Sequence, residues 1–141
     1  MGRILAIDFG RKRSGIAVTD PMQIVANGLT TVATHTLIDY LQAYTQREQV
    51  EKIVVGLPRQ LNGEPSESMK WLEPFLNRLR KVMPAMPVVM FDERFTSTLA
   101  HRAMLDGGMK KHDRHNKEVV DAIAAAIILN DYLASNARGG L

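Results

Sequence analysis

The stretch ILAIDFGRKRSGIAVTD, residues 4–20, decides the fold of this chain. Its first apolar run, residues 4–7, has the length of a buried strand and ends at Asp8. Gly10 marks a turn, and the chain becomes apolar again at Ile16. The stretch therefore predicts a β-hairpin whose first strand ends in a carboxylate, next to a turn that carries three cations: Arg11, Lys12 and Arg13.

The composition is that of one globular domain. We predict this domain over residues 1–136 and a flexible C-terminal tail at 137–141, because 141 residues with 45% hydrophobic content suffice for a single core. The absence of cysteine excludes a disulfide scaffold and thiolate chemistry, and it suits the cytoplasm. We expect no targeting or membrane segment. The formal net charge of +3 permits a polyanionic partner without requiring one.

Five short segments have the length and composition of β-strands: residues 4–7, 14–19, 28–32, 52–55 and 87–91. The first three have short connections, which favours an antiparallel meander. The last two alternate with helical patterns, as in units of a parallel sheet. The expected fold is therefore α/β, with a mixed sheet flanked by helices and a site at the carboxyl ends of the strands.

Apolar residues recur at helical spacing in four segments: 37–44, 66–83, 96–107 and 116–134. Ser66 is a candidate cap for the second segment, and Pro74 inside it predicts a kink or a late start. Thr96 or Ser97 would cap the third, which the glycines at 107 and 108 end. Helices thus account for most of the chain outside the strands.

Four carboxylates are candidates for a shared site. Asp8 ends the first strand, and Asp92 and Glu93 follow the last one, so their positions meet if the strands run parallel. Asp121 shares an alanine-rich stripe of the last helix, which should face the sheet. Because grouped carboxylates repel one another, we expect a divalent cation, Mg²⁺ or Mn²⁺, to hold them together. Capping, ion pairing or a helix-dipole contact is the alternative for each acid.

Cations lie close in sequence to each candidate acid, as they would to bind the phosphates of a nucleic acid. The alternative is a solvated basic loop. No aromatic residue interleaves with these cations, so stacking on bases is not predicted, and Trp71 is interpreted as a packing residue. The candidate phosphate-binding residues are Arg11, Lys12, Arg13, Arg94, Lys110, Lys111, Arg114 and Lys117.

Four blocks resemble the YqgF/RuvX family, Holliday-junction-resolvase-like members of the RNase H superfamily. They are AIDFGRKRSGIAVTD, IVVGLP with NG soon after, DERFTS and KEVVDAIAAAIIL, in the family's order and over nearly the whole chain. The resemblance implies an RNase H-like fold with sheet order 3-2-1-4-5. It implies a metal-dependent nuclease that processes the 5′ end of pre-16S ribosomal RNA. It also implies Asp8, Glu93 and Asp121 as catalytic and metal-binding residues.

The second acid departs from the wider superfamily, in which it comes from the fourth strand. Here that strand ends in Gly56 and the acid comes from the fifth, so Asp92 is a rival to Glu93. Two alternatives therefore stay open, a Holliday-junction resolvase acting on branched DNA and a non-catalytic RNA-binding factor of ribosome assembly. The expected partners are pre-rRNA or branched DNA and a ribosomal precursor particle, bound by a monomer or a homodimer.

Overall fold

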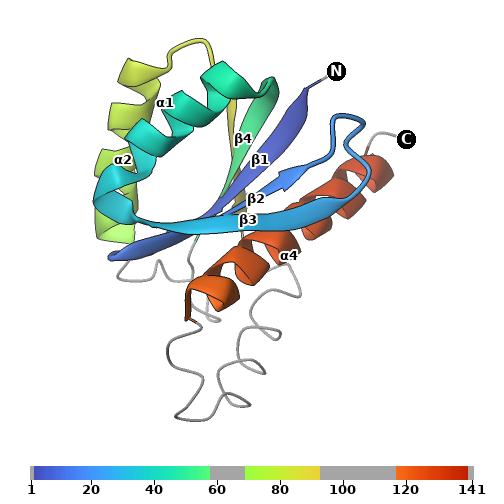
Figure 1. Ribbon diagram of the computed structural model, residues 1–141. Helices are drawn as coiled ribbons and strands as arrows, with labels where there is room; N and C mark the ends of the chain where they lie inside the picture. The colour runs from blue at the N-terminus through green and yellow to red at the C-terminus, as the bar shows by residue number, and fades with distance from the viewer. Residues whose placement is uncertain (1, 58–68, 93–116, 140–141) are drawn as a thin grey trace.

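A five-stranded mixed sheet forms the centre of the molecule (Figure 1). The computed structural model describes residues 2–57, 69–92 and 117–139. The strands lie in the order β3-β2-β1-β4-β5, which confirms the expected order. β1 pairs antiparallel with β2 and β2 with β3, whereas β1–β4 and β4–β5 are parallel. The strand bounds are β1 Arg3–Asp8, β2 Arg13–Thr19, β3 Ala26–Ala33, β4 Val50–Leu57 and β5 Val88–Asp92.

Helices cover both faces of this sheet. A short 3-10 turn η1, Thr34–Thr36, leads into α1, Leu37–Arg47, and α2 spans Met69–Val82. Pro74 lies inside α2, so the helix does not start late. α4, Lys117–Gly139, passes the expected end near residue 134 and includes part of the segment expected as a tail. The helix expected at 96–107 and the cap at Ser66 lie outside the described residues. Among the described helices, none is long and apolar enough to cross a membrane.

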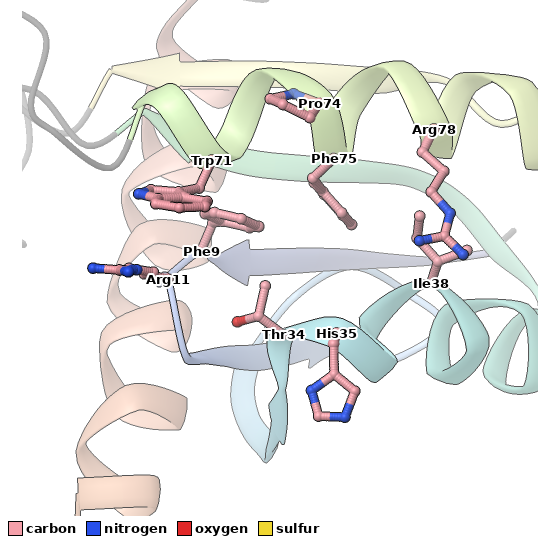
Figure 2. Close-up of a pocket in the computed structure, with 9 residues that line it drawn as sticks. All are labelled: Phe9, Arg11, Thr34, His35, Ile38, Trp71, Pro74, Phe75 and Arg78. Carbon is pink, nitrogen blue, oxygen red and sulfur yellow. The ribbon is translucent and has the colours of Figure 1, made fainter.

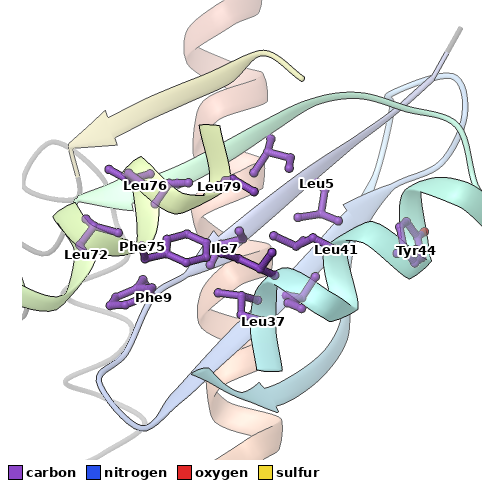
Figure 3. Packing of buried hydrophobic residues seen from close by; sticks show 14 of the residues in the cluster. Leu5, Ile7, Phe9, Leu37, Leu41, Tyr44, Leu72, Phe75, Leu76 and Leu79 are labelled. Atoms are coloured by element: carbon purple, nitrogen blue, oxygen red, sulfur yellow. The ribbon is translucent and has the colours of Figure 1, made fainter. Parts of the chain in front are cut away.

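The alternation of side chains along β1 divides the core into two layers. Leu5, Ile7 and Phe9 pack with α1 and α2 on one face (Figure 3). Ile4 and Ala6 pack with α4 on the other face. Because successive side chains of a strand point to opposite faces, Asp8 belongs to the α4 face.

α4 lies unusually close to the strands because two glycines face it. A Cβ placed on Gly15 of β2 would overlap the backbone carbonyl of Asp121 in α4. A Cβ placed on Gly28 of β3 would lie 3.1 Å from the carbonyl oxygen of Ala122. The approach matches the expectation that the small residues of α4 let its backbone come near the sheet. It also places the N-terminal part of α4 directly over the β1–β2 hairpin.

Candidate functional site

Asp8 lies at the carboxyl end of β1 and is only 6% exposed. Its partner across the antiparallel ladder is Gly15, the residue whose backbone touches that of Asp121. The missing side chain at Gly15 therefore lets the backbone of Asp121 lie directly against the strand next to Asp8. The fold brings Asp8 and Asp121 to the same end of the sheet and to the same face.

Arg13 forms a partly exposed ion pair with Asp121. Its Nε donates a hydrogen bond to Oδ2 of Asp121 at 3.1 Å, and the two side chains are 42% and 25% exposed. The contact joins the first residue of β2 to α4. A partly exposed ion pair of this kind is worth at most about 1 kcal/mol, so a stronger ligand for either group can replace it.

Two hydroxyl groups fix the turn that carries the three neighbouring cations. The Thr34 hydroxyl donates to the Gly10 carbonyl at 2.7 Å and lies 2.9 Å from the hydroxyl of Ser14. Since Thr34 uses its only proton on Gly10, Ser14 must be the donor in that second contact. The Thr34 amide donates to the carbonyl of Lys12 at 2.9 Å. The turn is thus tied to β2 and η1 before it meets any ligand.

Neither hydroxyl was identified from the sequence. Ser14 is fully buried, and a lone hydroxyl at the start of an apolar strand was the signal that could have marked it. Thr34 is the first residue of η1, after the N-cap residue Ala33. Its role in fixing the turn depends on the register in which β2 pairs with β3, which the expected antiparallel meander left open.

The other candidate acids lie at the end of β5. This strand is parallel to β4, which is parallel to β1, so the carboxyl ends of all three point to one edge of the sheet. Asp92 is the last residue of β5 and pairs in register with Leu57. Glu93 lies outside the described residues. Within the described part of the chain, no group of three or more acidic, histidine or cysteine residues could hold a metal ion.

Half of the candidate phosphate-binding residues lie within the described part of the chain. Arg11, Lys12 and Arg13 are exposed on the β1–β2 turn, next to the end of β1. Lys117 is the first residue of α4. Four others lie outside the described residues: Arg94, Lys110, Lys111 and Arg114.

A pocket of about 260 Å³ lies on the opposite face of the sheet, beside the same turn (Figure 2). Trp71 of α2 lines it and is 45% exposed, so the interpretation of this residue as a packing residue is wrong. The Arg11 guanidinium lies over its ring, 4.6 Å from the centroid. Sequence spacing did not suggest this pair because the two residues come from distant segments that only the packed sheet brings together.

Comparison with a solved structure shows the fold class. The chain superposes on Thermus thermophilus RuvC, solved "in complex with Holliday junction substrate", with a TM-score of 0.58. The match covers 99% of this chain and 97% of RuvC at 20% sequence identity, which establishes the fold alone. The fold is RNase H-like, as expected.

Sequence comparison is more specific. The chain is 60% identical over 135 residues to a Phocaeicola vulgatus protein, covering 96% of this chain and 97% of that one. It is 61% identical over 133 residues to a Bacteroides fragilis protein, covering 94% and 96%. Both relatives carry the name "Putative pre-16S rRNA nuclease". The family model "RuvX: Holliday junction resolvase" matches residues 2–135, and the chain therefore belongs to the RuvX family.

Proposed function

We propose that this chain is a cytoplasmic endonuclease that hydrolyses phosphodiester bonds in structured nucleic acid with a divalent metal ion. Its substrate is the 5′ end of pre-16S ribosomal RNA, within a ribosomal precursor particle. The observation that supports the proposal is that buried Asp8 pairs with Gly15, and that Gly15 lies against the backbone of Asp121 in α4. The names of relatives about 60% identical support the choice of RNA.

Asp8, Glu93 and Asp121 would hold Mg²⁺ or Mn²⁺, with Asp92 as the alternative to Glu93. The donor chemistry fits, since Mg²⁺ and Mn²⁺ prefer carboxylate oxygens and Mg²⁺ needs only a few from the protein. Asp8 offers such oxygens from a strand end held by the buried core. A bound divalent ion would lower the pKa of an attacking water and neutralise charge that develops on the phosphate.

The remaining residues bind and orient the substrate. The exposed turn cations, Arg11 to Arg13, pair with phosphates on either side of the bond to be cut. Ser14 and Thr34 hold that turn in place, so little ordering is needed when the substrate binds. If Asp121 holds a metal ion, Arg13 would be free of its ion pair with this carboxylate and available to a phosphate.

Replacing Asp8 tests the proposal. Cleavage of a 5′-extended pre-16S RNA in Mg²⁺ or Mn²⁺ should fall more than about 100-fold in Asp8→Asn, because a metal ligand contributes several kcal/mol. The matched control is Asp39→Asn on the exposed surface of α1, which should cleave at the parent rate. Equal cleavage by Asp8→Asn and the parent would remove Asp8 from the site.

The same assay separates the alternatives. Cleavage of a four-way DNA junction but not of RNA would indicate a resolvase, the activity in the family's description. RNA binding without any metal-dependent cleavage would indicate a non-catalytic assembly factor. A parallel comparison of Asp92→Asn with Glu93→Gln identifies the second acid, since only the metal ligand should lose activity to the extent of Asp8→Asn.

A further inference from the structure

The pocket beside the β1–β2 turn combines an aromatic floor with a cationic rim (Figure 2). Phe9 and Phe75 form the buried part of the floor, with their ring centroids 5.2 Å apart. Trp71 extends it into solvent. Arg11 and Arg78 supply the rim from the turn and from α2. The volume, about 260 Å³, is just below the roughly 300–1,000 Å³ typical of drug-sized ligands, so it suits one small planar group.

We propose that this pocket is a subsite for one unpaired nucleotide of the substrate strand. The base stacks on Trp71, Arg11 pairs with the phosphate of this nucleotide, and Arg78 pairs with the next phosphate along the strand. The inference rests on the proposed function in two respects: the substrate is a nucleic acid, and the place of the nucleotide relative to the cleaved bond depends on Asp8. It differs from the metal site in its residues, its face of the sheet and its chemistry.

The state of Trp71 favours a base as the occupant. The Trp71 side chain is 45% exposed, and the Arg11 guanidinium over its ring occupies a place that another flat, weakly hydrated partner could take. A nucleobase is such a partner, and stacking on tryptophan is tolerant of base identity. When the base takes the ring face, Arg11 is released toward the phosphate of the same nucleotide.

The positive charge of the pocket lining favours an occupant that carries phosphate. The described lining residues include two arginines and His35 but no carboxylate. Guanidinium groups bind phosphate oxygens through paired, charge-assisted hydrogen bonds, which lysine does not match. Figure 2 shows Arg78 reaching from α2 toward Ile38 of α1, across the pocket from the Trp71 end. The two arginines thus lie at different ends of the aromatic floor.

The position of the pocket relates it to the proposed cleavage site. Phe9 follows Asp8 directly in the chain, and the two side chains face opposite sides of the same sheet end. A single strand that crosses the β1–β2 turn therefore meets Asp8 on one side and Trp71 on the other. The occupant is a nucleotide next to the bond to be cut, which would bias cleavage toward sites with an unpaired neighbour.

Fluorescence provides a direct test, because Trp71 is the only tryptophan of the chain. The full-length protein is titrated in EDTA with a single-stranded oligoribonucleotide of about eight nucleotides, a length within the usual range of single-strand footprints. We expect quenching of Trp71 that saturates with binding. An abasic oligonucleotide of the same length keeps the phosphates and should not quench. Equal quenching by the two would overturn the proposal.

Variants give an independent measurement through the anisotropy of a labelled oligonucleotide. Trp71→Ala should weaken binding about 5- to 100-fold, and Trp71→Phe should restore most of the affinity. Arg78→Ala should weaken binding about tenfold, whereas Arg80→Ala, an exposed cation of α2 outside the pocket, should change it less than about twofold. Unchanged affinity in Trp71→Ala, or equal effects of the two arginine variants, would refute the subsite.

Neither measurement needs cleavage or metal, so each proposal can fail alone. Quenching without any cleavage would leave the subsite intact and remove the nuclease. If Asp8→Asn abolishes cleavage but the normal and abasic oligonucleotides quench Trp71 equally, the nuclease proposal stands and the subsite is refuted. Circular dichroism checks that Trp71→Ala folds. If it does not fold, the comparison of Arg78→Ala with Arg80→Ala tests the subsite.

Discussion

At the scale of single residues, Arg13 is a partly exposed cation that contacts one of the candidate acids. It was expected to bind phosphate, and in the structure its Nε contacts the Asp121 carboxylate at 3.1 Å. Both roles suit a half-exposed guanidinium, because the pair is weak enough to exchange. Under the proposed function, Arg13 would pair with Asp121 in the free protein and with a substrate phosphate once Asp121 holds a metal ion.

Replacing Arg13 with glutamine separates these two roles. The free energy of unfolding should change by less than about 1 kcal/mol, as for other exposed ion pairs. The slope of log K against log salt for RNA binding should fall by about one unit, because one phosphate contact is lost. Thermal unfolding and salt-dependent binding measure the two quantities. A large loss of stability with an unchanged salt slope would make Arg13 a structural residue.

The sequence was sufficient to predict where Asp8 and Asp121 lie in the fold, because each has a local pattern, and their role in a site stays a prediction. Asp8 ends an apolar run, and Asp121 shares a helical stripe with buried Ala124, Ala125 and Ile128. Trp71 has no such pattern beside Arg11, since their contact exists only after α2 packs over the β1–β2 turn. Residues whose role depends on contacts between distant elements are those that the sequence did not reveal.

At the scale of elements, the β2–β3 turn shows how one side chain can organise a loop. The carboxylate of Asp20 accepts hydrogen bonds from the amides of Met22, Ile24 and Val25, at 2.8–3.0 Å. These bonds, that of Val25 above all, hold the pKa of Asp20 below its ordinary value of 3.8. Gln23 adopts a φ of 60°, a left-handed conformation that the surrounding bonds help to maintain.

The lowered pKa predicts a pH-dependent effect of Asp20→Ala. Ionised Asp20 stabilises the folded turn at neutral pH, and this contribution is lost as the pH falls below 3.8 and through the lower folded-state pKa. Asp20→Ala should therefore unfold at a lower temperature than the parent at pH 7. The difference should shrink in acid, as circular dichroism melting curves would show. A difference that does not depend on pH would contradict the role of the charge.

The elements themselves were largely predictable. Each expected strand matches an observed one to within two residues at its start, because apolar runs and turn residues mark strands locally. Pro74 was a poor guide to the start of α2. The helix continues through this proline, although proline has no amide proton to donate to the helix. The end of α4 was placed too early because its last residues are polar and carry no apolar periodicity.

At the scale of the whole molecule, the close contact between α4 and the sheet links the second core layer to the candidate site. The contact depends on Gly15 and Gly28, which leave room for the helix backbone. Ala125, Ile128 and Leu129 then complete the second core layer against Ile4 and Ala6. A shift of α4 would move Asp121 relative to Asp8 and would also loosen this layer.

Adding a methyl group at Gly15 tests this dependence. Gly15→Ala should lower the free energy of unfolding by about 1–3 kcal/mol, because the new Cβ would overlap the Asp121 carbonyl. Gly28→Ala should cost less, since its Cβ would lie 3.1 Å from the nearest α4 atom and a small shift would suffice. Urea unfolding of the two variants gives the comparison. An equal or larger cost at Gly28 would show that Gly15 does not set the helix position.

The packing of α4 on β1 and β2 also has a consequence for biosynthesis. Arg13 and Asp121, which meet in the fold, lie 108 positions apart in the chain. The ribosome adds about 5–20 residues per second, and α4 follows every other described element, so it emerges last. The early strands can pair while translation continues, but Asp8 has no α4 to face until then. If Asp8 and Asp121 form the proposed site, a nascent chain stays inactive until α4 has emerged from the ribosome and packed on the sheet.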